Sequence, residues 1–303
     1  MKNFADQLIE AIRTKGNPCV VGLDPRFDLF PQFLKTGSTD DSIRSAIAGF
    51  HRIVLDVVSP LVPVVKPQIA FFEQYGIPGL LAFSDTIEYA KEKGLLVIGD
   101  VKRNDIASTA TAYANAYLGR REVMGRKTPV FDLDAITVSP FLGRDSLTPF
   151  VEICNAYGKG LFILVKTSNP GSKDFQDMIL RETGKPMYCR VAEMVHELGK
   201  DLVGSSGYSS IGAVVGATFP EEAPALRKLM PKSFFLVPGY GAQGGTAQQA
   251  MAAVDAKGLG VLVNSSRGIT YCYQDAKITE SELRDSILRA TKKMIEEVTS
   301  VIV

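Results

Sequence analysis

The chain has 303 residues, 46% of them hydrophobic, and its 34 Lys and Arg nearly balance its 33 Asp and Glu, for a formal net charge of +1. This balance gives no support to nucleic acid or an anionic membrane surface as a partner. The most apolar stretch, residues 57–65, is interrupted by Pro60 and Pro63 and is too short to cross a bilayer. Because residues 1–6 also lack the basic and apolar segments of a signal peptide, we expect a soluble cytoplasmic protein.

Short, mostly β-branched apolar runs alternate along the chain with segments of helical periodicity. The predicted strands are Cys19–Leu23, Pro63–Lys66, Leu95–Ile98, Ala135–Ser139, Gly160–Lys166, Ile211–Ala217, Phe234–Val237 and Leu259–Asn264. The predicted helices are Phe4–Thr14, Asp40–Val58 with Asp40 or Asp41 as its cap, Leu80–Lys93, Thr109–Met124, Asp145–Tyr157, Met187–Leu198, Glu221–Leu229, Gly245–Ala256 and Glu280–Val298. A long polar loop, Thr167 to Pro186, follows the fifth strand.

This alternation predicts an α/β protein with a parallel sheet. Eight strand–helix units without an obvious linker favour a (β/α)₈ TIM barrel with extra N- and C-terminal helices, formed as a single domain by residues 1–303. A doubly wound open sheet is the alternative.

Cysteine and histidine usage limits the kinds of site that the chain can build. The four cysteines are scattered and form no CxxC pair, which favours a reducing compartment and argues against a zinc site. His51 and His196 are the only histidines, so the chain has few residues from which to build a histidine metal site or a Ser-His-Asp triad. His51 lies within a helical pattern and is expected to be structural.

Charged residues gather directly after the third predicted strand. Asp100, Lys102, Arg103 and Asp105 follow an apolar run within six residues. Because side chains alternate along a strand, Asp100 and Lys102 are expected to point the same way. Such a cluster is costly to bury unless its charges are paired or used. Taken alone, a solvated turn with a surface ion pair explains it equally well.

Polar or turn-forming residues follow nearly every predicted strand, and in a barrel these positions meet at the face that carries the active site. They are Asp24, Lys66, Asp100, Lys102, Ser139, Lys166, Thr167, Ser168, Thr218, Pro238, Gly239 and Asn264 to Arg267. Convergence of so many on one rim favours a functional site over a set of ordinary turns.

Two of these loops suggest an anion pocket. Residues 238–246 form a glycine-rich loop that opens a predicted helix, and residues 264–268 carry Arg267. Glycines let backbone N–H groups approach an oxyanion, a helix N-terminus adds favourable partial charge, and arginine adds a forked cation. The loops after the seventh and eighth strands often bind phosphate on this fold. No Lys-Ser/Thr follows the glycines, so the loop is not a Walker A motif.

The charged cluster then acquires a chemical interpretation. Opposite charges at Asp100 and Asp105 would keep Lys102 protonated, which makes it a proton donor to a developing carbanion. Asp100 beside it would repel a substrate carboxylate. Each carboxylate has its own cation, so we expect a site without metal.

The segment from Asp100 to Ile106 resembles the Asp-x-Lys-x-x-Asp-Ile signature of the orotidine 5′-phosphate decarboxylase family, and the Lys-Arg pair is similar to its longer bacterial (type 2) branch. Five other segments also resemble this branch. They are NPCVVGLDP (17–25), VKPQIAFF (65–72), KTSNPG (166–171), PGYGAQGG (238–245) and residues 265–268. The Asp-Lys-Asp motif alone is shared with other phosphate-binding barrels, whereas its combination with PGxGAQGG and TSNPG is specific.

The resemblance implies decarboxylation of orotidine 5′-monophosphate to UMP, without a cofactor, in de novo pyrimidine synthesis. It implies that Lys102 protonates C6, that Asp100 crowds the substrate carboxylate, and that Lys66 and Asp105 complete the charge network. The implied substrate contacts are Asp24 and Lys66 at the ribose, Ser168 at the pyrimidine, Gln243 between base and phosphate, Pro238, Arg267 and Gly268 in the phosphate loops, and Ile106 around the departing CO₂. It also implies a homodimer in which Asp105 and Thr109 act on the partner's substrate.

Asn104 and Ala107 stand where glycines are common in this branch, which puts the local backbone shape in question. The loop at residues 172–186 is expected to be either a lid or an inert insertion. Two other functions stay open: a related metal-dependent sugar-phosphate decarboxylase or aldolase, and a catalytically silent nucleotide-binding protein. Against the first, Glu73 lies too far beyond Lys66 to serve as a metal ligand. Against the second, a binding site would gain little from burying so many charges.

Overall fold

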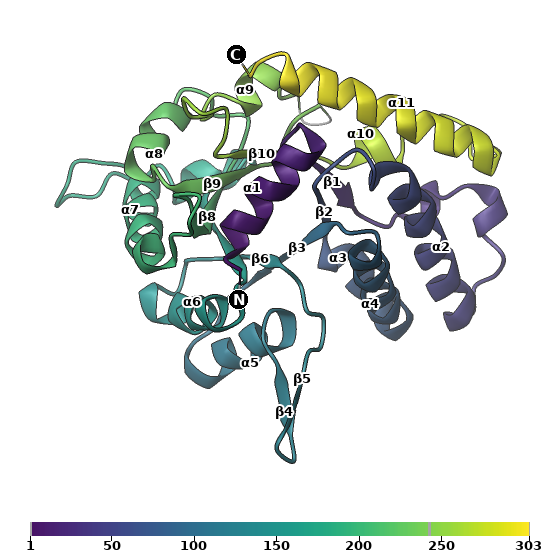
Figure 1. The fold of residues 1–303 in the computed structure, drawn as a ribbon, viewed down its shortest axis with the longest axis horizontal. Coiled ribbons are helices and arrows are strands. Elements are labelled where there is room, and N and C mark those ends of the chain that lie inside the picture. Colours follow the sequence, from purple (N-terminus) through teal and green to yellow (C-terminus); the bar gives the residue numbers. More distant parts are fainter. Residues whose placement is uncertain (1, 242–243, 303) are drawn as a thin grey trace.

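The computed structural model describes residues 2–241 and 244–302. Within them, eight parallel strands close into a barrel in the order β1-β10-β9-β8-β7-β6-β3-β2 (Figure 1). The barrel strands are β1 (Cys19–Leu23), β2 (Val64–Pro67), β3 (Leu96–Arg103), β6 (Ala135–Val138), β7 (Gly160–Lys166), β8 (Ser209–Val215), β9 (Ser233–Val237) and β10 (Val261–Ser265). The predicted (β/α)₈ barrel is confirmed, and the open doubly wound sheet is excluded.

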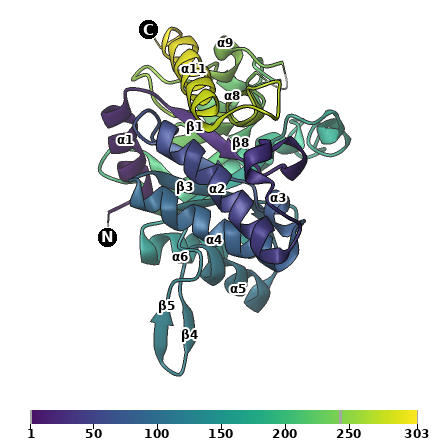
Figure 2. The same cartoon turned by 90° about the vertical axis from the view of Figure 1, so that its right-hand side faces the viewer.

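Helices between the strands form the outer layer (Figures 1 and 2). They are α2 (Asp40–Val58), α3 (Ile69–Glu73), α4 (Gly76–Glu92), α5 (Ala107–Tyr117), α6 (Arg144–Tyr157), α7 (Met187–Gly199), α8 (Ala223–Leu229), α9 (Ala247–Ala250) and α10 (Arg267–Thr270). Short 3₁₀ turns occupy Phe27–Leu29, Gln32–Leu34, Pro170–Asp174 and Lys200–Leu202. The predicted extra helices are α1 (Phe4–Lys15) before the barrel and α11 (Glu280–Thr299) after it.

Helix α1 closes the N-terminal mouth of the barrel. Its apolar face, with Phe4 and Leu8, joins the core formed by inward-facing strand residues such as Val20 and Phe162. The ring of Phe4 meets Phe162 edge-on at 6.1 Å between centroids. Gly160 permits this approach, because a Cβ there would lie 2.2 Å from the Phe4 ring. With one mouth plugged by apolar packing, the carboxyl ends of the strands are left for the site.

Two helices are much shorter than predicted, and a third, predicted at Leu80–Lys93, begins earlier, at Gly76. The helix predicted at Thr109–Met124 ends at Tyr117, and a hairpin of β4 (Arg121–Val123) and β5 (Arg126–Thr128) follows. Met124 and Gly125 both have positive φ, at 51° and 77°, as the two-residue turn of a hairpin requires. The helix predicted at Gly245–Ala256 is reduced to Ala247–Ala250, capped by Thr246. The cap of α2 is Thr39, not Asp40 or Asp41.

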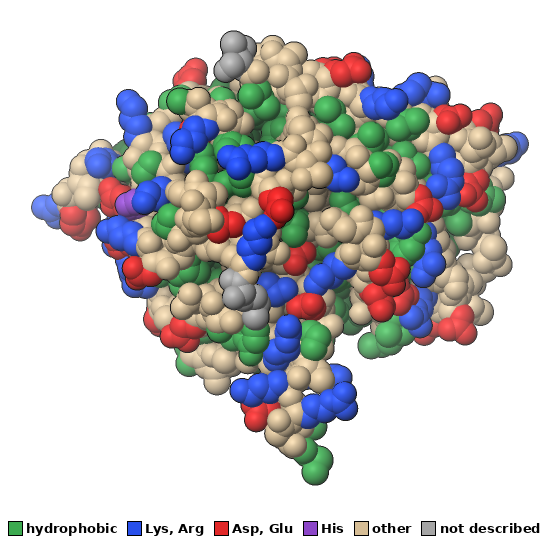
Figure 3. Space-filling model, in the orientation of Figure 1, with side chains coloured by type: hydrophobic (Ala, Val, Ile, Leu, Met, Phe, Trp, Pro, Cys, Tyr) green, Lys and Arg blue, Asp and Glu red, His purple; other side chains and the backbone are tan. Residues whose placement is uncertain are grey.

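The hairpin projects from the body of the molecule (Figures 1 and 2). Acidic and basic side chains are otherwise interspersed over the face seen in Figure 3, in keeping with the balanced net charge. No helix in residues 2–241 and 244–302 is both long and apolar enough to cross a membrane.

Candidate active site

A cavity of about 710 Å³ opens at the carboxyl ends of the barrel strands, a volume suited to a small-molecule ligand. Its apolar wall includes Leu164, Val214 and Leu236. Its polar lining includes Asp24, Arg26, Lys66, Gln68, Asp100, Lys102, Thr137, Thr167, Ser168, Tyr240, Asn264, Ser266 and Arg267. Most of the strand-end residues therefore converge on one rim, as the sequence indicates, whereas Ser139, Lys166, Thr218 and Ser265 do not line the cavity.

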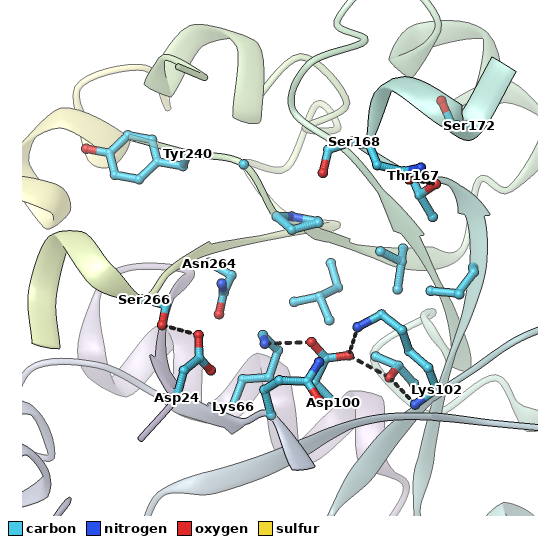
Figure 4. Close-up of a pocket in the computed structure, with 18 of the residues that line it drawn as sticks. Asp24, Lys66, Asp100, Lys102, Thr167, Ser168, Ser172, Tyr240, Asn264 and Ser266 are labelled. Carbon is cyan, nitrogen blue, oxygen red and sulfur yellow. Dashed lines mark hydrogen bonds and ion pairs between the residues drawn. The ribbon is translucent and has the colours of Figure 1, made fainter. Parts of the chain in front are cut away.

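A row of alternating charges crosses one wall of the cavity (Figure 4). Lys66 Nζ lies 2.9 Å from Asp100 Oδ2, and Lys102 Nζ lies 2.6 Å from Asp100 Oδ1. Lys66 is contributed by β2 and the other two residues by the adjacent β3, so neighbouring parallel strands bring them together. The expectation that Asp100 and Lys102 point the same way agrees with their contact.

Burial and pairing set the ionisation of this row. Burial opposes the charge on Lys66, which is only 5% exposed, but Asp100 and Asp24 outweigh it and raise the pKa of Lys66. Burial alone would raise the pKa of Asp100, yet Lys66 and Lys102 hold that pKa well below its usual range. Asp100 is therefore ionised and Lys66 protonated around neutral pH.

Asp24 continues the row beyond Lys66 (Figure 4). Its burial raises its pKa, against the opposing effects of Lys66 and of the Ser266 hydroxyl that donates to its carboxylate. The Tyr271 hydroxyl donates to the backbone carbonyl of Asp24 at 2.9 Å. Asp24 Oδ1 and Asn264 Oδ1 are buried without a hydrogen-bond partner in the described part of the chain. The end of the row thus retains polar atoms to which the protein gives no partner.

The loops after β9 and β10 form the part of the rim next to Asp24, whose carboxylate accepts from Ser266. Pro238, Gly239 and Tyr240 line the cavity after β9, and Arg267 lines it after β10. Gly239 and Gly241 have φ of 104° and 70°, which a side chain would disfavour, so the loop shape depends on glycine. Gly268, next to Arg267, is exposed but does not belong to the cavity lining. Gln243, the predicted bridge between base and phosphate, lies outside the described residues.

The loop after β7 bends over the cavity and is tied to the barrel. Ser168 lines the cavity, and so do Ser172 and Phe175 from the segment of undecided role (Figure 4 labels Ser168 and Ser172). Fully buried Lys166 pairs with Asp177, and Gln176 accepts the backbone N–H of Thr167 at 2.9 Å. Part of this loop therefore helps to enclose the cavity, which an inert insertion would not do.

Three further predicted residues do not line this chain's own cavity. Asp105, Ile106 and Thr109 are absent from its lining. Asp105 Oδ1 accepts the backbone N–H of Ile106 at 2.8 Å, and the side chain of Ile106 is 53% exposed. Ala107 has φ +47°, a conformation that favours glycine, so the departure noted at this position is one of backbone strain.

Metal-binding groups do not gather in the part of the chain that the structure describes: no three His, Cys, Asp or Glu side chains there are arranged to hold an ion. Glu73 forms an ion pair with Arg103 instead. His51 is buried in α2, with Nδ1 3.0 Å from the Thr86 hydroxyl, which agrees with its expected structural role.

Some cavity residues were not predicted from the sequence. Thr137 lies within an apolar strand, where a lone threonine is unremarkable, and Gln68 and Arg26 follow strands in turns. The position of Gln68 and Arg26, each two residues beyond a selected strand-end residue, could have identified them. Thr137 lies inside a strand and not at its end, so its position gave no indication of a functional hydroxyl.

A family model, curated relatives and a solved structure that match this chain all bear the name of one enzyme family. The family model described as "Orotidine 5′-phosphate decarboxylase / HUMPS family" matches residues 47–280. A Rhodopirellula baltica protein named orotidine 5′-phosphate decarboxylase is 48% identical over 304 residues, covering 98% of this chain and 99% of that protein. A protein of the same name from Caldicellulosiruptor bescii is 44% identical over 308 residues and is matched along 100% of both chains. The structure of Leishmania donovani OMP decarboxylase is 31% identical, with a TM-score of 0.73 and coverage of 99% of this chain and 98% of that one.

Proposed function

The chain belongs to the orotidine 5′-phosphate decarboxylase family, and we propose that the charged row on its cavity wall carries out that family's reaction. The protein is a carboxy-lyase of pyrimidine biosynthesis, which converts orotidine 5′-monophosphate to UMP and CO₂. The observation that carries the proposed mechanism is the contact of Asp100 with both Lys66 and Lys102 inside the cavity. This arrangement supplies a fixed negative charge and a proton donor side by side.

The proposed chemistry follows from those two groups. The Asp100 carboxylate faces the carboxylate of the bound substrate and destabilises it by like-charge repulsion, which is relieved as CO₂ leaves. The electron pair of the broken C6–carboxylate bond stays on C6 and takes a proton from Lys102 Nζ. No acceptor for electrons is required, because the only changes are loss of CO₂ and gain of one proton.

The rest of the cavity is proposed to position the substrate. Asp24 and Lys66 hold the ribose hydroxyls, Ser168 contacts the pyrimidine, and Arg267 binds the phosphate with the Pro238 loop. The two unpartnered oxygens at the Asp24 end support this orientation, because hydroxyl groups would supply them with donors. Binding energy from the distant phosphate is then available at the reacting carbon.

We further propose a homodimer in which the segment from Asp105 to Thr109 completes the partner's cavity. Its support is the position of Asp105, Ile106 and Thr109 outside their own cavity, with Ile106 largely exposed. We also propose that the chain forms one domain, that it works in the cytoplasm, and that it uses no metal or cofactor. Its four cysteines are free thiols, which fits a reducing compartment.

The central experiment compares Lys102→Ala with the parent, following absorbance as orotidine 5′-monophosphate is consumed. Loss of a general acid costs at least about 10²-fold in turnover, and UMP binding is expected to survive. Lys127→Ala serves as the matched control, since that lysine lies in the exposed β4–β5 hairpin and pairs only loosely with Glu122. Near-parent turnover by Lys102→Ala would remove this residue from the acid role.

Chelator treatment separates the proposal from the metal-dependent alternative. Protein treated with EDTA and assayed in metal-free buffer is expected to keep its activity. Inactivation that magnesium reverses would instead favour a metal-dependent sugar-phosphate type of enzyme. Absence of any turnover by the parent would favour a silent binding protein.

Mixing inactive variants tests the shared site. Lys102→Ala and Asp105→Ala are each expected to be inactive alone, because each homodimer lacks one group at both sites. In a random mixture, half of the dimers carry one intact site, so about a quarter of parent activity returns. No recovery, after exchange of subunits has been verified by mass, would place Asp105 in its own chain's function.

A further inference from the structure

Thr137 makes two hydrogen bonds to the residues of the charged row. It lies on β6 beside β3, is 1% exposed, and lines the cavity. Its hydroxyl lies 2.9 Å from Asp100 Oδ1 and 3.1 Å from the backbone nitrogen of Lys102. An N–H can only donate and an ionised carboxylate can only accept. The hydroxyl must therefore accept from Lys102 N and donate to Asp100.

The backbone of β3 is irregular where Thr137 meets it. The pairing of β3 with β6 shifts between Gly99 and Arg103, so the regular ladder is interrupted on either side of Asp100 and Lys102. Lys102 itself has φ +45°, in a region that residues other than glycine avoid. At this bulge the threonine hydroxyl takes the place of a backbone acceptor for Lys102 N–H.

Both oxygens of Asp100 are held by this arrangement. Oδ2 accepts from Lys66 Nζ at 2.9 Å, while Oδ1 accepts from Lys102 Nζ at 2.6 Å and from Thr137. The lysine contacts come from long, flexible side chains, and that of Lys102 is 44% exposed. The Thr137 contact comes from a short, β-branched and fully packed side chain, which has little freedom to move.

We propose that Thr137 is a positioning residue, whose hydroxyl fixes the Asp100 carboxylate and the Lys102 backbone relative to each other. The inference rests on the proposed roles of Asp100 and Lys102 in the decarboxylation. Without the hydroxyl, the carboxylate can rotate about its side-chain bonds, and the bulge that presents Lys102 loses its anchor. The Asp100 carboxylate and the Lys102 ammonium are then no longer held in one fixed geometry relative to the substrate.

The test compares Thr137→Val, which keeps the shape and removes the hydroxyl, with Thr137→Ser, which keeps the hydroxyl and removes a methyl group. Loss of a hydrogen bond to a charged group predicts that kcat of Thr137→Val falls about 10- to 100-fold. We expect Thr137→Ser to stay within about threefold of the parent and the affinity of Thr137→Val for UMP to change by less than about threefold. UMP has no carboxylate to face Asp100, so its binding reports on the general shape of the cavity.

Thr291→Val is the matched control, because Thr291 is a buried threonine of α11 whose hydroxyl bonds to a helix carbonyl away from the cavity. It is expected to retain parent kcat. Should Thr137→Val not fold, as judged by circular dichroism, Thr137→Ala removes the same hydroxyl with a smaller side chain.

Several outcomes would overturn the inference. Equal losses in Thr137→Val and Thr137→Ser would assign the effect to packing, and near-parent kcat in Thr137→Val would show that the hydroxyl is dispensable. UMP affinity that falls as far as kcat would indicate a distorted cavity. The parent enzyme separates this failure from failure of the proposed function, since a parent without turnover refutes the latter and leaves no rate for Thr137 to affect.

Discussion

Asp100→Asn is the substitution whose effect on stability follows most directly from the structure. It preserves the shape of the side chain and removes the charge that faces Lys66 Nζ at 2.9 Å. The Lys66 side chain is only 7% exposed, so its ammonium regains little water. Breaking one partner of a buried pair costs about 3–5 kcal/mol. Asp24 still attracts Lys66, which places the expected loss near 3 kcal/mol.

The pH dependence supplies a sharper signature. In the parent, the raised pKa of Lys66 contributes stability that is complete below its ordinary value of 10.5 and is lost only as pH rises through the raised pKa. Burial lowers the pKa of Lys66, and in Asp100→Asn only Asp24 is left as the main group that raises it. We therefore expect this pKa to fall below 10.5. The unfolded state then binds more protons than the folded state. The stability of the variant should therefore rise with pH, and its deficit against the parent should shrink.

Urea unfolding at pH 7 and pH 9 measures both effects. With a slope near 3 kcal/mol per molar urea, the variant's midpoint should lie about 1 M below the parent's at pH 7 and closer to it at pH 9. Asp85→Asn is the control, since it removes a carboxylate from the more exposed pair with Arg44 and should shift the midpoint far less. A deficit below about 1 kcal/mol, or one that grows with pH, would refute the reasoning.

Three further predictions concern other parts of the chain. Ala107→Gly relieves a φ of +47° and should raise stability by up to about 1 kcal/mol, since the relief of strain exceeds glycine's entropy cost; a lower urea midpoint would contradict this. Burial lowers the pKa of His51 to about 3, so the unfolded state gains a proton first as pH falls, and stability drops by about 2 kcal/mol between pH 7 and pH 5. His51→Asn should flatten this part of the stability–pH curve, and an unchanged slope would argue against His51 as its source. Arg267→Ala should lower kcat/KM for orotidine 5′-monophosphate at least about 100-fold and hardly affect the phosphate-free nucleoside; equal losses would show that Arg267 does not recognise phosphate.

The barrel itself was largely predictable from the sequence. Parallel strands are buried on both faces, so each appears as a short apolar run between turn residues. Cys19–Leu23, Gly160–Lys166 and Asp40–Val58 agree with the structure at both ends. The β4–β5 hairpin was missed, because its strands have only three residues each, nearly all of them exposed, and carry no apolar pattern. Its turn residues Met124 and Gly125 were the available signal.

The site was predictable to the extent that function resides at strand ends. Asp24, Lys66, Asp100, Lys102, Ser168, Pro238 and Arg267 all line the cavity. Thr137 escaped because nothing in a single apolar strand reveals which neighbour its hydroxyl will meet. That contact depends on the shift in pairing between β3 and β6, and such a shift cannot be predicted from the local sequence.

The charge balance of the cavity explains why the segment from Asp100 to Asp105 divides its residues between two places. Within one chain, the row contains two carboxylates, Asp24 and Asp100, and two ammonium groups, Lys66 and Lys102. A third carboxylate on the same wall would have no cation of its own and would be costly to bury. The positive φ of Lys102 and Ala107 turns the backbone, and Asp105 lies outside the lining. In the proposed dimer, that carboxylate enters the partner's cavity, so folding of the single chain does not bear the cost of burying it, and its repulsion acts on the substrate only when the site is complete.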